Sequence, residues 1–165
     1  ELVHGALDGG HRILLFSQFT GMLDIIGKRL AKEDIVFLKL TGASSKESRA
    51  KMVAQFQAGE VPVFLISLKA GGVGLNLTAA DVVIHYDPWW NVAAQDQATD
   101  RAHRIGQQHT VTVYKLIAKD TIEERIMQMQ ESKRDLVNSV LGGDGISSAL
   151  FTREDVLALL GGDGR

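Results

Sequence analysis

Short apolar runs alternate along the chain with amphipathic segments, and this alternation is the most regular feature of the sequence. Five runs have the length of buried strands: residues 13–16, 36–40, 63–66, 82–85 and 111–116. Strands that are separated by helical segments are typical of βαβ units, whose strands pair in parallel. The pattern therefore predicts an α/β domain in which helices flank a mainly parallel central sheet.

The segments between the runs have the period of amphipathic helices. After the first run, apolar residues recur at helical spacing and predict one buried stripe: Phe19, Met22, Leu23, Ile26 and Leu30. Ser44 followed by Glu47 predicts a capping box at the start of the next helix, which Gly59 would end. Asp120 with Glu123 gives the same start signal for a long helix.

The length of 165 residues suits one domain. We expect residues 1–9 to be the end of a truncated upstream helix and residues 10–140 to form the domain. Residues 141–165 are expected to form a flexible, glycine-rich tail with a short helix, because Gly-Gly-Asp-Gly occurs there twice.

Composition excludes several classes of protein. The chain has no cysteine, which excludes a disulfide framework and a thiolate metal site. None of its five histidines forms a ligand-spaced pair with a carboxylate, so we expect no metal site. No apolar run approaches the roughly 20 residues that cross a bilayer. With a net charge of -2, the chain must bind any nucleic acid through a local patch or backbone amides.

The strongest chemical signal is the segment 97–107, which carries two arginines three residues apart. On a helix, Gln97, Arg101 and Arg104 lie on one face, and alanines on another face allow close packing against a sheet. Two guanidinium groups one turn apart can bind phosphate oxygens and stabilise the charge that develops in phosphoryl transfer. The alternative is a solvated charged helix in which Asp100 pairs with Arg104.

Two further segments suggest contacts with phosphates or nucleic acid. Residues 67–77 are rich in glycine, which allows backbone amides to approach a phosphate closely, although such a turn also occurs as a simple tight connection. Residues 86–91 read Tyr-Asp-Pro-Trp-Trp-Asn. Adjacent tryptophans cannot both face one core, so we expect at least one to be exposed, where it can contact a nucleic-acid groove or pack its loop onto its own helix.

Taken in order, these segments resemble the motifs of the Swi/Snf family within helicase superfamily two. The second lobe of that family carries Ser-Gln-Phe after its first strand, matched here at residues 17–19, and a turn matched here at residues 41–44. The resemblance covers about residues 11–140. It implies a RecA-like three-layer sandwich, which would be the C-terminal lobe of an ATP-dependent translocase on double-stranded DNA, of the chromatin-remodeller type.

The resemblance also implies roles for individual residues. Arg104 corresponds to the arginine finger that reaches the γ-phosphate, and Arg101 corresponds to its partner at the nucleotide. The other residues implied at the ATP cleft are Gly72, Gly74, Asn76, Gln97 and Asp100. The residues implied at DNA are Gln18, Thr41, Gly42, Ser67, Lys69, Trp89, Trp90 and Asn91.

The chain departs from the family pattern in three ways. Val92 replaces a proline, and Ala43 replaces a polar residue of the turn, which weakens the assignment of that turn to DNA. The sequence has neither a Walker lysine loop nor an Asp-Glu magnesium motif. We therefore expect ATP with Mg to be bound mainly by an N-terminal RecA-like lobe of the same polypeptide. The isolated lobe is expected to be a monomer without ATPase activity.

Other classes of protein stay open at this point. A Rossmann oxidoreductase shares the α/β pattern, but Gly-x-Gly-x-x-Gly is missing after the first apolar run. An RNA helicase of superfamily two shares the arginine segment, and a non-catalytic protein-binding module could use the same fold. The expected partners are duplex DNA, the N-terminal lobe and a DNA-bound protein that is displaced, with no membrane. The expected location is a prokaryotic cytoplasm, with the nucleus as the alternative.

Overall fold

The chain is described here from a computed structural model. The residues that the structure describes are 1–71, 75–87, 92–102, 107, 110–119, 121, 124–125, 127–128 and 131. Residues 1–89 and 94–116 form one compact unit, and residues 90–93 and 117–165 form a second. In the second unit, the Thr121 hydroxyl donates to the carbonyl of Ala118 at 2.7 Å. The predicted glycine-rich tail, and most of the helix predicted from Asp120, lie outside the described residues.

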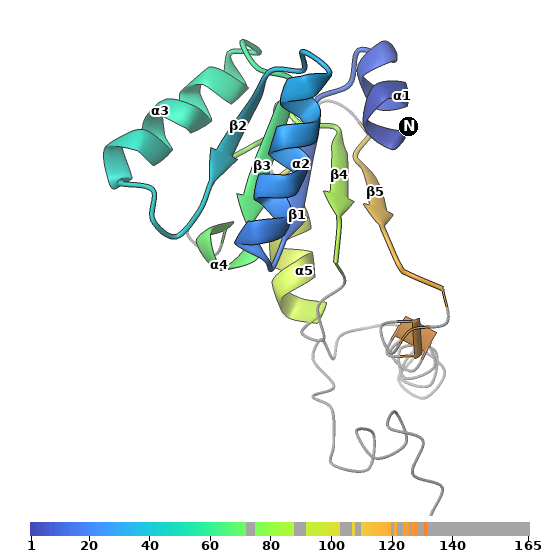
Figure 1. Ribbon diagram of the computed structural model, residues 1–165. Coiled ribbons are helices and arrows are strands. Elements are labelled where there is room, and N and C mark those ends of the chain that lie inside the picture. Colours follow the sequence, from blue (N-terminus) through green and yellow to red (C-terminus); the bar gives the residue numbers. More distant parts are fainter. Residues whose placement is uncertain are drawn as a thin grey trace, which may run out of the picture. The chain divides into compact units, whose positions relative to one another are not determined.

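A five-stranded sheet forms the centre of the first unit, and all of its pairings are parallel (Figure 1). Its strands are β1 (Ile13–Ser17), β2 (Phe37–Leu40), β3 (Val63–Ser67), β4 (Val82–His85) and β5 (Thr112–Lys115). They lie in the order β2-β3-β1-β4-β5, so β1 is central. The parallel α/β sheet predicted from the apolar runs is confirmed, and the ends of each run agree with those of an observed strand to within one residue.

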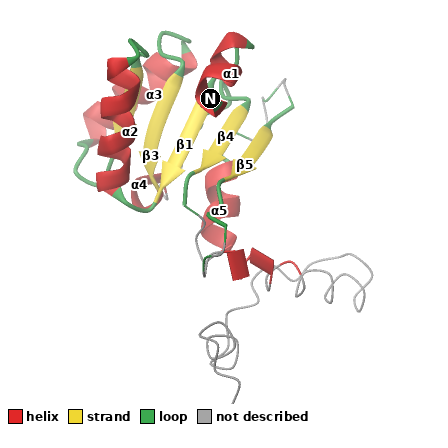
Figure 2. Cartoon of the chain, turned by 45° about the vertical axis from the view of Figure 1, so that its right-hand side comes forward, coloured by secondary structure: helices red, strands yellow, loops and turns green. Residues whose placement is uncertain are grey.

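Helices cover both faces of this sheet. The helices are α1 (Leu2–Asp8), α2 (Thr20–Lys32), α3 (Lys46–Gln57), α4 (Leu68–Gly71) and α5 (Val92–Thr99). Residues of α1 and α2 pack on one face, and residues of α3 and α5 pack on the other. Figure 2 shows α2 and α3 on opposite sides of the strands. The result is the three-layer sandwich that the resemblance implied.

The core explains why the strands read as unbroken apolar runs. Every residue of β1, β3 and β4 is buried, because each of these strands has a helix layer on both faces. Alternate residues serve different layers: Leu14 and Phe16 pack on the α3 side with Phe56, while Ile13 and Leu15 pack on the α2 side. The sheet is therefore a rigid support whose strand ends can carry chemistry.

Two local predictions are wrong. Phe19 is not on the buried stripe of α2, because it is the N-cap residue of that helix and is 59% exposed. The N-cap of α3 is Ser45 and not Ser44, since the Ser45 hydroxyl accepts from the backbone N–H of Ser48 at 3.2 Å. The Ser44 hydroxyl instead accepts from the backbone N–H of Thr41 and closes the turn after β2.

Candidate functional site

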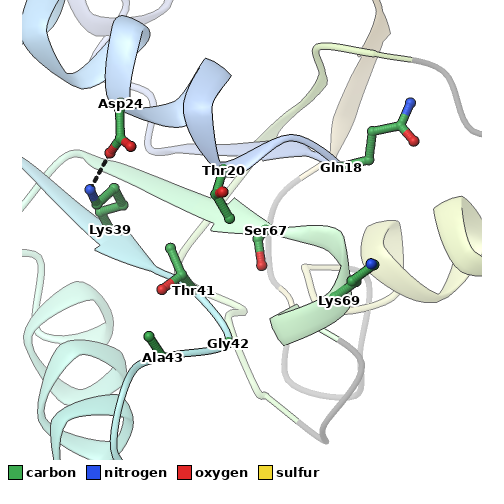
Figure 3. A pocket seen from close by; sticks show the side chains of 9 residues that line it. All are labelled: Gln18, Thr20, Asp24, Lys39, Thr41, Gly42, Ala43, Ser67 and Lys69. Atoms are coloured by element: carbon green, nitrogen blue, oxygen red, sulfur yellow. Dashed lines mark hydrogen bonds and ion pairs between the residues drawn. The ribbon is translucent and has the colours of Figure 1, made fainter.

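The carboxyl ends of β1, β2 and β3 meet at one edge of the sheet and open onto a hollow of about 440 Å³ (Figure 3). Ligands of open parallel α/β sheets bind at this edge, because the loops after neighbouring strands converge there. The hollow is lined by residues from the turns after β1 and β2, from β2 and β3, and from α2 and α4: Gln18, Thr20, Asp24, Lys39, Thr41, Gly42, Ala43, Ser67 and Lys69.

The lining of the hollow includes every residue assigned to DNA that the structure describes. These residues come from three separate segments of the sequence, and they are Gln18, Thr41, Gly42, Ser67 and Lys69. The other three, Trp89, Trp90 and Asn91, lie outside the described residues. Parallel topology brings the first five together, since each follows or ends a strand whose carboxyl end lies at the same edge.

The lining includes hydroxyl and amide groups and carries charges of both signs. Lys69 is exposed and forms no ion pair with any described residue. Lys39 donates from Nζ to Oδ1 of Asp24 at 2.5 Å, as the dashed line in Figure 3 shows. This hydrogen bond and the charge of Lys39 hold the pKa of Asp24 below its usual value. Ammonium and hydroxyl groups in such a hollow suit an anionic ligand with several oxygens.

Arg49 of α3 holds the segments that follow β2 and β3 in place through hydrogen bonds to their backbone carbonyls. Its Nε donates to the carbonyl of Ser44 at 3.0 Å, and its Nη2 donates to the carbonyls of Thr41 at 3.2 Å and Gly42 at 3.5 Å. Its Nη1 donates to the carbonyl of Ala70, in α4, at 3.3 Å. One guanidinium group therefore joins the turn after β2 to the segment after β3, and both segments line the hollow.

Asp87 performs the corresponding task for the turn after β1. Its carboxylate accepts from the Ser17 hydroxyl at 2.5 Å and from the backbone N–H of Gln18 at 2.8 Å. The Ser17 oxygen also accepts from the backbone N–H of Phe19 at 3.0 Å. Neither Asp87 nor Arg49 was a predicted site residue, because the bonds that they form depend on where the fold places distant carbonyl and N–H groups.

The arginine segment differs from the prediction made from helical spacing. Helix α5 ends at Thr99, and residues 100–102 continue as turns, so Gln97 and Arg101 do not lie on one regular helix. Gln97 and Asp100 are exposed, whereas Arg101 is only 2% exposed. Arg104, Gly72 and Gly74 lie outside the described residues.

Hydrogen bonds join the arginine segment to the segment after the glycine-rich loop. The backbone N–H of Leu77 donates to the carbonyl of Arg101 at 3.0 Å. The Gln107 side-chain amide donates to the carbonyls of Ala80 at 2.8 Å and Thr78 at 3.0 Å. Asn76, which the resemblance implied at the ATP cleft, is exposed next to this junction in the sequence. Two of the predicted motifs are thus mechanically connected within the lobe.

A buried histidine next to the end of α5 was missed by the sequence analysis. His85, the last residue of β4, stacks on Phe16 with ring centroids 5.6 Å apart and lies 3.0 Å, through Nε2, from the Thr99 hydroxyl oxygen. Burial, with a smaller contribution from the positive charge of Lys115, lowers the pKa of His85 to about 4. The ring is therefore neutral near pH 7, and it supports the end of α5.

Among the described residues, no group of three or more His, Asp or Glu side chains is arranged to hold a metal ion. None of the described helices has both the length and the apolar character needed to cross a membrane.

Comparison with known proteins gives a consistent result. The family of the helicase conserved C-terminal domain matches residues 1–106. An uncharacterised ATP-dependent helicase of Mycoplasma pneumoniae is 46% identical over 160 residues, which are 96% of this chain and 16% of that protein. The human chromatin-remodelling ATPase INO80 is 44% identical over 152 residues, which are 92% of this chain and 10% of that protein. The chain thus spans a small part of these relatives.

Solved structures agree with the sequence relatives. The SWI2/SNF2 ATPase core domain of Sulfolobus solfataricus is 37% identical with a TM-score of 0.73, covering 96% of this chain and 32% of that one. The C-terminal part of the Fun30 ATPase domain is 32% identical with a TM-score of 0.74, covering 93% and 47%. The chain therefore belongs to the helicase conserved C-terminal domain family, as a RecA-like lobe of the Swi/Snf type.

Proposed function

We propose that this chain is the second motor lobe of an ATP-dependent translocase on double-stranded DNA. The observation that carries the proposal is the hollow at the carboxyl edge of β1, β2 and β3, which gathers the described residues assigned to DNA. The relatives of this chain include ATP-dependent helicases and chromatin-remodelling ATPases, which supports ATP use by the whole protein.

In this proposal the hollow binds the sugar-phosphate backbone of one DNA strand. The exposed ammonium of Lys69 attracts the phosphate, and the Thr41 hydroxyl and the backbone of Gly42 supply hydrogen-bonding groups at the same rim. Contacts of this kind are independent of base sequence, so they let a lobe move along a duplex without separating its strands. The net charge of -2 fits a protein that binds DNA through such a local patch and not over its whole surface.

The arginine segment supplies the second part of the proposed mechanism. Hydrolysis of ATP would supply the free energy for movement, and we assign Arg104 as the finger that stabilises the charge on the transferred phosphate. Arg101 is buried in this lobe, so we assign it to support the turn that leads to Arg104. In this proposal, the exposed side chains of Asn76, Gln97 and Asp100 would line the ATP cleft together with Arg104. We assign the binding of ATP and Mg mainly to the N-terminal lobe of the same polypeptide, as the resemblance implies.

The test separates DNA binding from catalysis in the full-length protein that carries this lobe. Arg104→Ala should lower duplex-stimulated ATP turnover by a factor of about 10³ and leave duplex affinity near normal. Lys69→Gln should retain kcat, require more DNA for half-maximal stimulation and lower the salt dependence of binding by about 0.9 in log-log slope.

Lys32→Gln is the matched control for Lys69. Lys32 is exposed at the end of α2, about 18 Å along the helix axis from Thr20 at the hollow. Unchanged ATP turnover in Arg104→Ala would exclude that residue from the mechanism. Equal effects of the two lysine substitutions on DNA binding would contradict the assignment of the hollow as the DNA site. Stronger stimulation by RNA than by duplex DNA would favour an RNA helicase instead. The 165-residue chain alone should show no ATPase activity.

A further inference from the structure

The hollow contains one carboxylate among groups that suit a phosphate, and the proposed function does not use it. Asp24 projects from α2, and Lys39 projects from the facing side of β2, the edge strand (Figure 3). The two side chains form an ion pair at 2.5 Å. Of the two ammonium groups in the lining, that of Lys39 is therefore occupied, while that of Lys69 is available to a ligand.

The ion pair is open to exchange. The side chains of Lys39 and Asp24 are 40% and 52% exposed, so water and salt reach both partners. Exposed pairs of this kind are weak, and a phosphate that enters the same hollow competes with the carboxylate on similar terms. With two ammonium groups and one carboxylate, the lining carries a formal charge of only +1.

We propose that Asp24 is a built-in competitor of the DNA phosphate for Lys39 and thereby weakens the hold of the hollow on the DNA backbone. This inference rests on the proposed function. When DNA binds, Lys39 either stays on Asp24 and contributes nothing, or it moves to the phosphate and leaves the Asp24 carboxylate with only the more distant charge of Lys28. Both outcomes cost affinity. A lobe that steps along a backbone must release each phosphate, and a reserved partner for Lys39 favours that release.

The test is a cycle of substitutions in the full-length protein, with affinity for a labelled duplex measured without nucleotide. Asp24→Asn keeps the shape of the side chain and removes its charge. It should tighten duplex binding about two- to fivefold at low salt, the range that follows from measured strengths of exposed pairs. The gain should shrink towards physiological ionic strength because the interaction is screened. If the asparagine variant folds poorly, Asp24→Ala can replace it and should give the same gain in affinity.

The second arm of the cycle asks whether the gain passes through Lys39. Lys39→Gln alone should weaken duplex binding, because it leaves the Asp24 carboxylate without its partner, whereas Lys39→Gln in the Asp24→Asn background should abolish the gain. Glu60→Gln is the matched control: Glu60 is exposed and lies before β3, at the amino edge of the sheet, a strand length of about 15 Å from the hollow. This control should leave affinity unchanged.

Each outcome decides a different claim. A gain that persists without Lys39 would mean that Asp24 acts only by repelling DNA, and no gain at all would mean that the pair is not in competition; either result overturns the inference. If Lys69→Gln still weakens duplex binding in that case, the proposed function stands. If the wild-type protein binds no duplex, the proposed function itself fails, and the inference fails with it.

Discussion

Replacing Arg49 by methionine should destabilise the lobe and reshape the hollow at the same time. Methionine keeps most of the length and apolar volume of the side chain, so the change removes mainly the guanidinium group. That group donates to four backbone carbonyls, those of Ser44, Thr41, Gly42 and Ala70, at 3.0 to 3.5 Å. After the substitution these carbonyls lose a charged donor, although the carbonyl of Thr41 keeps the bond from the backbone N–H of Ser44 at 3.1 Å.

The magnitude follows from the number and setting of these bonds. A hydrogen bond from a charged donor contributes about 1.5–3 kcal/mol, and a buried acceptor that loses its partner costs a similar amount. The 3.5 Å bond to Gly42 is long and lies in an exposed turn, so it adds little. Water can also replace part of the bond to Thr41. A loss of about 2–4 kcal/mol in the free energy of unfolding is therefore expected.

The assay is urea denaturation of the chain, followed by circular dichroism, with Arg29→Met as the control. Arg29 carries the same group on α2, but its side chain is 75% exposed and forms an ion pair with Glu33 in the next helical turn. Such exposed pairs contribute little, so this variant should unfold near the wild-type midpoint. Arg49→Lys should fall between wild type and Arg49→Met, since one ammonium cannot reach all four carbonyls. Equal midpoints for the two methionine variants would refute the role assigned to Arg49.

Two further predictions concern stability. Gly27→Ala in α2 should destabilise the lobe by about 1–2 kcal/mol, because its Cβ would meet Cζ of Phe37 at 2.9 Å. On the same helix, the Cβ of Gly21→Ala would meet nothing within 4 Å, so this substitution should stabilise the lobe by up to about 1 kcal/mol. Thermal unfolding should show melting temperatures shifted in opposite directions, and shifts of the same sign would contradict this packing. His85 should make stability fall as pH drops from 6.5 to about 4, because burial lowers its pKa from 6.5 to about 4 and in that window only the unfolded chain binds the proton. The full effect is about 3 kcal/mol, and His85→Phe should flatten the pH profile there; an unaltered profile would show that another group causes the acid sensitivity.

The strands could be predicted from the sequence because their environment leaves a simple pattern. Strands β1, β3 and β4 are buried on both faces, so their residues are almost all apolar, and no polar alternation interrupts the signal. The ends of the helices were harder to predict from the sequence. Ser44 and Ser45 are both good N-cap residues, and the choice between them depends on the turn after β2, where the Ser44 hydroxyl bonds to Thr41.

The site could be predicted only in part, for a related reason. The hollow follows from topology, since parallel strands carry their following turns to the same edge. Arg49 and Asp87 could not be identified in this way, because their partners are main-chain groups that are distant in sequence, such as Ala70 for Arg49 and Gln18 for Asp87. The arrangement of Gln97 and Arg101 differs from helical spacing because that spacing was extended past Thr99, where the helix ends and the carbonyl of Arg101 accepts from Leu77.

These contacts divide the residues in and around the hollow into two groups, which under the proposed function would affect DNA binding in physically different ways. Arg49 and Asp87 use their charges on backbone groups of the lobe itself, so they set the shape of the hollow. Lys69 and the pair of Lys39 with Asp24 offer or withhold charge at its surface. Loss of shape weakens binding at every salt concentration without changing the number of ions released, whereas loss of a phosphate contact lowers the slope of log affinity against log salt by about 0.9. Salt titration therefore separates the two groups even where their affinities are equal, because only the second group should change the slope.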